Sequence, residues 1–125
     1  MKKYFLLAFT LILLASACLM SCDKYRAKRW SGIYACQVDY HYFDITPQSI
    51  DCTYTQDIEI KEDGRNVIVL GHQVYVDCLR HENKYRVGDI HNYLEVQFKK
   101  KQVFIYRYGG GLGGNASYRY VGTKK

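Results

Sequence analysis

The stretch IDCTYTQDIEIKEDGRN, residues 50–66, decides the fold class. Its even-numbered positions up to residue 60 are isoleucine, cysteine, tyrosine and one glutamine, whereas its odd-numbered positions are aspartate, threonine, glutamate and lysine. Alternation with a period of two is typical of a strand that buries one face. The Asp63-Gly64 pair then supplies the positive φ of a tight hairpin turn. The stretch therefore predicts a strand over residues 50–61 that turns back through residues 62–66.

The same alternation recurs on both sides of this hairpin. It predicts further strands at residues 33–43, 67–78, 84–87, 93–99, 103–108 and 117–121. Gly71 marks a bulge or a second bend inside residues 67–78, and the glycine-rich residues 109–115 are expected to form a flexible loop. We expect seven or eight short strands in sequence, and closure into a barrel would remove their exposed edges. The prediction is an all-β domain, a small up-and-down antiparallel barrel, with a β-sandwich as the alternative.

The first 22 residues have the character of an export signal. Two lysines precede an apolar run over residues 4–14, which is short for a membrane span of about 20 residues and suits the apolar core of a signal peptide. The residues that follow, Leu19-Met20-Ser21-Cys22, resemble the lipobox of bacterial lipoproteins; Ala15-Ser16-Ala17-Cys18 matches it less closely. The resemblance implies cleavage before Cys22 and acylation of its sulfur by palmitate-like chains, with an ordinary secreted protein as the alternative.

Three segments follow from this interpretation. Residues 1–21 are the lipoprotein signal peptide, residues 22–29 are the lipidated cysteine with a basic tether, and residues 30–125 are the β-barrel domain. The mature chain would have 125 − 21 = 104 residues, the size of one small domain. We expect it in a bacterial cell envelope, anchored by its lipid, with the outer membrane favoured and the body either periplasmic or exposed at the surface.

A second resemblance concerns the two ends of the barrel domain. Trp30-Ser31-Gly32-Ile33-Tyr34 and Tyr118-Arg119-Tyr120-Val121 look like the first and last strands of small lipocalin-like bacterial lipoproteins. The resemblance implies that Trp30 and Gly32 plug one end of the barrel, with Arg119 or Arg107 over the indole ring. The chain departs from that family because its glycine follows the tryptophan and no C-terminal helix is present. The motif therefore supports the barrel more than it supports a ligand.

Three cysteines remain after the signal: Cys36, Cys52 and Cys78. An exported location permits disulfides. If residue 62 pairs with residue 66, Cys52 faces position 76 and Cys78 lies diagonally across from it, whereas Cys36 lies about 17 Å further along its strand. The register favours a Cys52–Cys78 bridge with Cys36 free, and the absence of any bridge is the alternative.

The composition argues against several classes of function. The net charge is 18 − 12 = +6, or 16 − 12 = +4 without Lys2 and Lys3, and no nucleic-acid-binding module is present. The four histidines, at positions 41, 72, 81 and 91, lack the spacing of a metal site. No nucleophile elbow or phosphate-binding loop appears. We therefore expect no enzyme, cofactor, metal or nucleic-acid partner.

The remaining expectation is a non-catalytic binding domain on an envelope lipoprotein. Its partners would be the membrane, through the lipid, and a glycan, a protein or a small apolar ligand. The alternatives are an inhibitor of a hydrolase such as lysozyme, or a carrier of a small apolar ligand. We expect the inward-facing tyrosines to fill the barrel, which favours binding at the surface, where Tyr75 is expected; these inward positions are Tyr34, Tyr40, Tyr54, Tyr118 and Tyr120.

Overall fold

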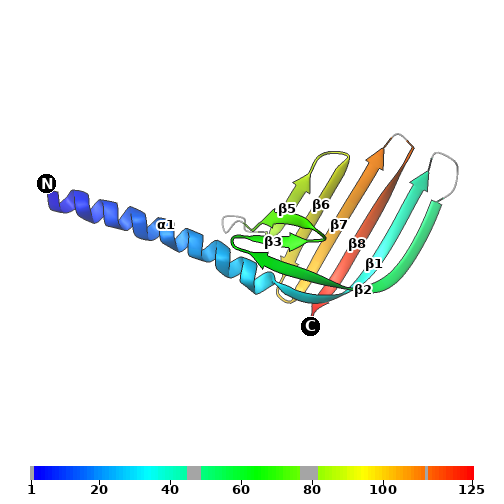
Figure 1. Cartoon of the computed structure of the whole chain (residues 1–125), viewed down its shortest axis with the longest axis horizontal. Coiled ribbons are helices and arrows are strands. Elements are labelled where there is room, and N and C mark those ends of the chain that lie inside the picture. Colours follow the sequence, from blue (N-terminus) through cyan, green and yellow to red (C-terminus); the bar gives the residue numbers. More distant parts are fainter. Residues whose placement is uncertain (1, 45–48, 77–81, 112) are drawn as a thin grey trace.

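A computed structural model describes residues 2–44, 49–76, 82–111 and 113–125, excluding the side chains of residues 16–23. In this part of the chain there are one helix and eight strands: α1 (Lys2–Trp30), β1 (Gly32–Asp44), β2 (Ser49–Asp63), β3 (Asn66–Val69), β4 (His72–Tyr75), β5 (Lys84–Gly88), β6 (Asn92–Lys99), β7 (Gln102–Gly111) and β8 (Gly114–Lys124). Figure 1 shows α1 projecting away from the strands.

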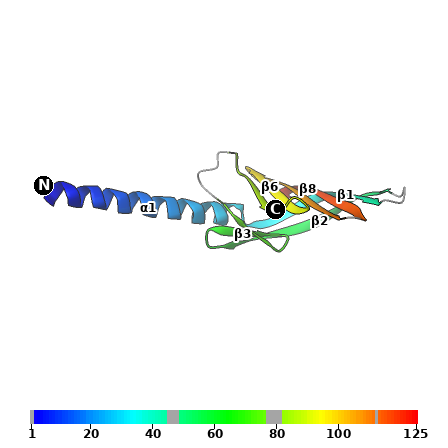
Figure 2. The same ribbon diagram turned by 90° about the horizontal axis from the view of Figure 1, so that it is seen from above.

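The eight strands form one antiparallel sheet that curls into a nearly closed barrel. Their order is β4-β3-β2-β1-β8-β7-β6-β5, so every pair of neighbours is consecutive in the chain except β1 and β8. The hairpin of β3 and β4 curls away from the plane of the other strands and forms a second layer near α1 (Figure 2). The predicted all-β, up-and-down barrel is confirmed, and the alternative β-sandwich does not form.

Most strand boundaries lie close to the predicted ones, and the turns explain why. Gly64, with φ 63°, turns β2 into β3 as the Asp-Gly pair predicts. Leu70 and Gly71, with φ of 50° and 80°, make a second hairpin turn, so the predicted strand over residues 67–78 is divided into β3 and β4.

The glycine-rich segment is different from its prediction. Residues 109–111 and 114–116 are not loop but paired strand, with Gly109 opposite Ala116 and Gly111 opposite Gly114. The glycines allow close approach, because a Cβ on Gly114 would come within 2.6 Å of the carbonyl oxygen of Phe43. The prediction of a flexible loop over residues 109–115 was wrong because glycine here serves tight strand packing.

The hydrophobic core fills the half of the barrel next to α1. Its buried side chains come from every strand and from the end of the helix, and include Val38, Ile60, Val67, Val69, Val74, Tyr85, Leu94, Val96, Phe98, Val103 and Ile105. Trp30 is 3% exposed and stacks on Phe98, with ring centroids 4.5 Å apart. The Tyr34 hydroxyl donates a hydrogen bond of 2.9 Å to the Trp30 carbonyl oxygen. The last turn of α1 is thus joined to the barrel.

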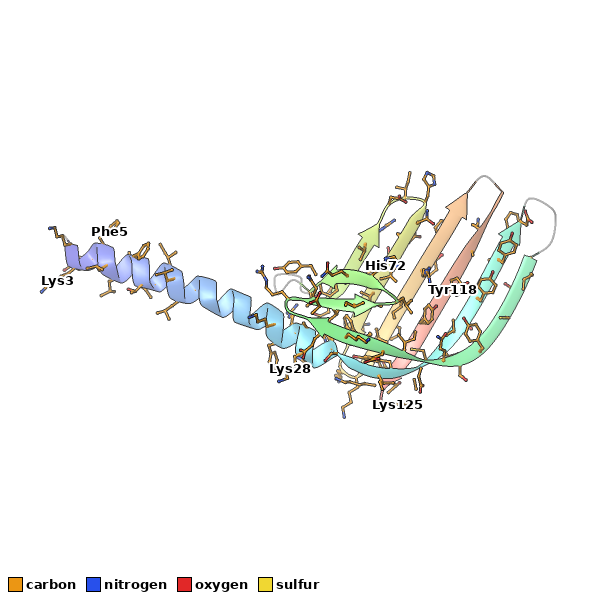
Figure 3. The ribbon with its side chains drawn as sticks, viewed as in Figure 1. Lys3, Phe5, Lys28, His72, Tyr118 and Lys125 are labelled. Carbon is orange, nitrogen blue, oxygen red and sulfur yellow. The ribbon has the colours of Figure 1, made fainter. Side chains whose placement is uncertain are left out.

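The end of α1 includes residues 22–29, which the sequence predicts to be the lipidated cysteine and a tether. These residues continue the helix, and Ala27 is fully buried in the core. By contrast, the apolar side chains of residues 4–14 are exposed along the projecting part of the helix, where Figure 3 labels Phe5. Within the described residues, no helix combines the length and the apolar character needed to cross a membrane.

Candidate functional site

The inward-facing tyrosines divide into two groups along the barrel. Tyr34 and Tyr120 are 1% and 4% exposed and belong to the core, as predicted. Tyr40 and Tyr118 are only half-buried, and Tyr54 is 38% exposed. Tyr118 still packs against the core, as predicted. The expectation of core filler was wrong for Tyr40 and Tyr54, because the β3–β4 hairpin covers only the end of the barrel near α1.

The uncovered tyrosines lie on the inner face of the sheet at the opposite end, a surface that we call the mouth. It consists of Tyr40 and Tyr42 on β1, Tyr54 on β2, and Tyr118 on β8. The register places Tyr40 directly opposite Tyr118 on one side and opposite Cys52 on the other. The Tyr40 and Tyr118 ring centroids are 4.7 Å apart with a tilt of 38°. Tyr118 also stacks on Tyr120 at 6.2 Å, which links the mouth to the core below it.

Arg107 places a positive charge in the mouth. It lies opposite Tyr118 on β7, and its guanidinium carbon is 5.9 Å from the centre of the Tyr118 ring. Sequence reasoning considered Arg107 only as a partner of Trp30. The alternation along β7 nevertheless predicts that Arg107 lies on the inner face. Val103 and Ile105 are buried on that face, and Arg107 is the next residue on it.

A cavity of about 300 Å³ opens beside these residues. His72 at the start of β4 and Tyr118 of β8, both labelled in Figure 3, line it together with Arg107, Val87 and Asn92. The lining therefore combines aromatic faces, phenol hydroxyls, an amide and a guanidinium. A space of this size suits a ring of a small ligand or one unit of a chain.

The surroundings of Tyr40, and of Tyr120 below the mouth, favour the neutral phenol. Partial burial raises the pKa of Tyr40, and the neighbouring Tyr118 phenol raises it further. Burial likewise raises the pKa of Tyr120, which Arg107 opposes. Phenols that stay neutral can both donate and accept hydrogen bonds. The mouth thus offers hydrogen bonds in both directions, together with one fixed positive charge.

The predicted plug residues lie apart from the mouth. Trp30 is buried where α1 enters the barrel, and Gly32 has φ 142° beside the side chain of Lys124. The predicted contact of Arg119 or Arg107 with Trp30 was wrong. Arg119 is exposed on the outer face of β8, and the guanidinium over Trp30, at 5.7 Å, is that of Arg26.

The end of the barrel around Trp30 carries a basic cluster. Arg29, Lys100, Lys101, Lys124 and Lys125 surround a depression of about 510 Å³ at the exit of α1. The Lys124 ammonium donates a hydrogen bond of 2.9 Å to the Arg29 carbonyl oxygen, so the C-terminus is fixed against the helix. Lys125 also forms an ion pair with Asp57. We call these five residues the basic end.

The cysteine expectations depend partly on residues outside the description. Cys36 is buried and Cys52 exposed, and neither forms a disulfide with another described residue. Cys78 lies outside the described residues, as do the side chains of Cys18 and Cys22, so the bridge and the acylation remain predictions. The assumed pairing of residues 62 and 66 was wrong by one residue, because Asp63 pairs with Asn66. The pairing of β2 with β3 covers only residues 61–63, so it does not extend to Cys52.

Neither a metal cluster in the described residues nor a known relative points to a second site. In residues 2–44, 49–76, 82–111 and 113–125, no three His, Cys, Asp or Glu side chains come together as metal ligands. No family model matches the chain, and neither a curated protein nor a solved structure matches it. The mouth itself therefore carries the functional argument.

Proposed function

We propose that this chain is a non-catalytic binding domain, tethered to a membrane of a bacterial cell envelope through an acylated Cys22, whose mouth binds a glycan. The observation that carries the proposal is the open inner surface of four tyrosines with Arg107 beside it. Flat aromatic rings pack against the C–H faces of sugar rings, and neutral phenols exchange hydrogen bonds with sugar hydroxyls.

The same surface is less suited to a small apolar ligand. The half of the barrel that could enclose such a molecule is filled by side chains that include Val38, Leu94 and Ile105, each at most 1% exposed. What remains open is lined by hydroxyls and a guanidinium, whose burial under an apolar ligand would cost free energy. Arg107 adds a preference for glycans that carry a carboxylate.

The basic end supports the membrane tether. It surrounds the emergence of α1, on the side of the barrel away from the mouth. Each Lys or Arg close to an anionic bilayer contributes about 1 kcal/mol of attraction. A chain held at Cys22 would therefore turn its basic end toward the headgroups and direct the mouth outward.

The glycan proposal is tested by titration calorimetry with two oligosaccharides of equal length, one neutral and N-acetylated, the other a uronate. We expect binding of both, tighter for the uronate. Tyr118→Ala should weaken it roughly 5- to 30-fold, from about 1–2 kcal/mol for the truncation of a central aromatic contact residue. Arg107→Gln should remove the preference for the uronate. Tyr75→Ala is the matched control, because Tyr75 is 48% exposed on the outer side of the hairpin. Absence of binding to both sugars would refute the glycan proposal.

The tether is tested separately, by the mass of the chain extracted from its own envelope and by the membrane fraction of Cys22→Ala. A mass starting at residue 22 with acyl groups, and release of Cys22→Ala from membranes, is the expected result. A start at Cys18, or an unmodified chain, would overturn the assignment of Cys22 without affecting the mouth.

A further inference from the structure

The basic end brings together cations from three separate parts of the chain. One lies in the last turn of α1 (Arg29), two lie in the turn between β6 and β7 (Lys100 and Lys101), and two lie at the end of β8 (Lys124 and Lys125). Figure 1 shows the C-terminus beside the end of α1. No acidic side chain of a described residue lines the depression that these cations surround. Positive charges gathered in this way repel one another, so an anion in the depression would lower their energy.

The helix explains only part of this cluster. A cation close to the C-terminus of a helix stabilises it, which accounts for Arg29 and for Lys124, whose ammonium reaches the Arg29 carbonyl oxygen. The two lysines of the β6–β7 turn are exposed and do not take part in that contact. Within the described residues, the side chains of Arg29, Lys100 and Lys101 form no hydrogen bond or ion pair. Three of the five cations are therefore available to a ligand.

The backbone around the depression is held in place before any ligand arrives. The Lys124 N–H donates a hydrogen bond of 2.7 Å to the Lys101 carbonyl oxygen, and the Lys125 N–H donates one of 2.9 Å to the Ile33 carbonyl oxygen. These bonds join the C-terminal residues to the β6–β7 turn and to β1. A ligand would have to order only the side chains, and the smaller loss of entropy favours binding.

We infer that the basic end is a binding site for two adjacent phosphate groups. Five side chains supply five positive charges, and Asp57 balances one of them through its ion pair with Lys125. A carboxylate would balance only one of the remaining four, whereas two phosphates supply about three to four negative charges near pH 7. Ammonium groups bind phosphate as point charges, and four of the five cations are lysines. The depression of about 510 Å³ has the size of a small-molecule site.

This inference deepens the proposed orientation of the basic end toward a membrane. It rests on that proposal only for the source of the phosphates, which are lipid headgroups if the basic end faces a bilayer and a soluble diphosphate if it does not. The charge balance and the fixed backbone are the same for both sources. The glycan proposed for the mouth has no part in it.

The test is titration calorimetry of the full chain in a non-ionic detergent with inorganic pyrophosphate, at about 0.15 M salt so that diffuse attraction is screened. We expect saturable binding of one pyrophosphate per chain. Lys100→Gln and Lys101→Gln should each weaken it about 3- to 10-fold, through the loss of one charged contact. The matched control is Arg119→Gln, which removes the same charge from the exposed outer face of β8 and should leave the affinity unchanged.

Detergent micelles that carry phosphatidic acid distinguish the two sources. Displacement of pyrophosphate by these micelles, but not by micelles with phosphatidylcholine, supports the site and assigns it to headgroups. Pyrophosphate binding that phosphatidic acid does not affect supports the site and assigns it to a soluble diphosphate, which removes the basic end from the membrane proposal. Absence of saturable binding, or equal weakening by Arg119→Gln, would overturn the site and leave the sugar titration at the mouth unaffected.

Discussion

Gly122 and Cys36 face each other in the core, and their contact allows a sharp test of the packing. A Cβ added at Gly122 would lie 3.2 Å from the Val103 Cγ1 and 3.3 Å from the Tyr34 Cβ, and would overlap the Cys36 Sγ. Val103 and Tyr34 are at most 1% exposed, so neither can move aside into solvent. Gly122→Ala alone should therefore lower the free energy of unfolding by about 1–3 kcal/mol, the usual cost of overpacking.

Removing the Cys36 sulfur should reverse this effect. Cys36→Ala alone deletes one buried heavy atom, at a cost of about 1 kcal/mol on the scale of a buried methylene group. In the double variant the methyl group introduced at position 122 occupies the space that the sulfur leaves, so the two costs should not add. We expect the double variant to be within about 1 kcal/mol of the natural chain, which is a coupling of roughly 1–3 kcal/mol between the two sites.

The assay is urea unfolding of the full chain in mild detergent, followed through Trp30. It is the single tryptophan, and its stacking on Phe98 makes its fluorescence sensitive to core packing. Gly113→Ala is the matched control, since nothing lies within 4 Å of a Cβ added there. If the double variant loses the sum of the two single losses, the proposed contact between residues 36 and 122 is refuted.

Three further predictions concern the helix junction, the effect of alkali and one turn. Trp30→Ala should cost about 3–5 kcal/mol in urea unfolding, and Trp30→Phe clearly less because a ring remains on Phe98; equal losses would contradict the stacking. Burial raises the pKa of Tyr34 to about 12 from its ordinary value of 10.0. Between these two pH values the unfolded chain ionises Tyr34 while the folded chain does not. The free energy of unfolding is therefore unaffected by Tyr34 below pH 10 and falls by about 1.4 kcal/mol per pH unit between pH 10 and 12. Unfolding midpoints across this range should fall less steeply in Tyr34→Phe, and an unchanged slope would show that other groups cause the loss. Lys100 has φ 53° in the β6–β7 turn, so Lys100→Gly should stabilise the chain by about 0.5–1 kcal/mol, and a lower melting temperature would contradict this.

The strands and their order follow from local patterns in the sequence. Alternation located β1 and β2 to within two residues, and the Asp63-Gly64 pair located the turn between β2 and β3. What local patterns do not contain is the extent of pairing. β3 ends at Val69 because the chain turns again at Leu70 and Gly71. The part of β2 that precedes Lys61 therefore does not pair with β3.

The candidate site depends on that missing neighbour. Tyr40, Tyr54 and Tyr118 have the same alternation as the buried Tyr34 and Tyr120, and no residue-level signal separates the two groups. Only the position of the β3–β4 hairpin decides which tyrosines are covered. Arg107 was the exception, because a charge that continues an apolar alternation marks a face that becomes accessible.

The continuity of α1 with the core has a mechanical consequence. Because Trp30 is stacked inside the barrel and the Tyr34 hydroxyl binds its carbonyl oxygen, the helix cannot swivel relative to the strands as a flexible linker would. Residues 22–30 would form a stiff post of roughly 13 Å at the helical rise of about 1.5 Å per residue. For a chain held at its acylated end, any pull on a bound glycan would then be transmitted directly to the anchor, and the mouth would sample one fixed height above the lipid.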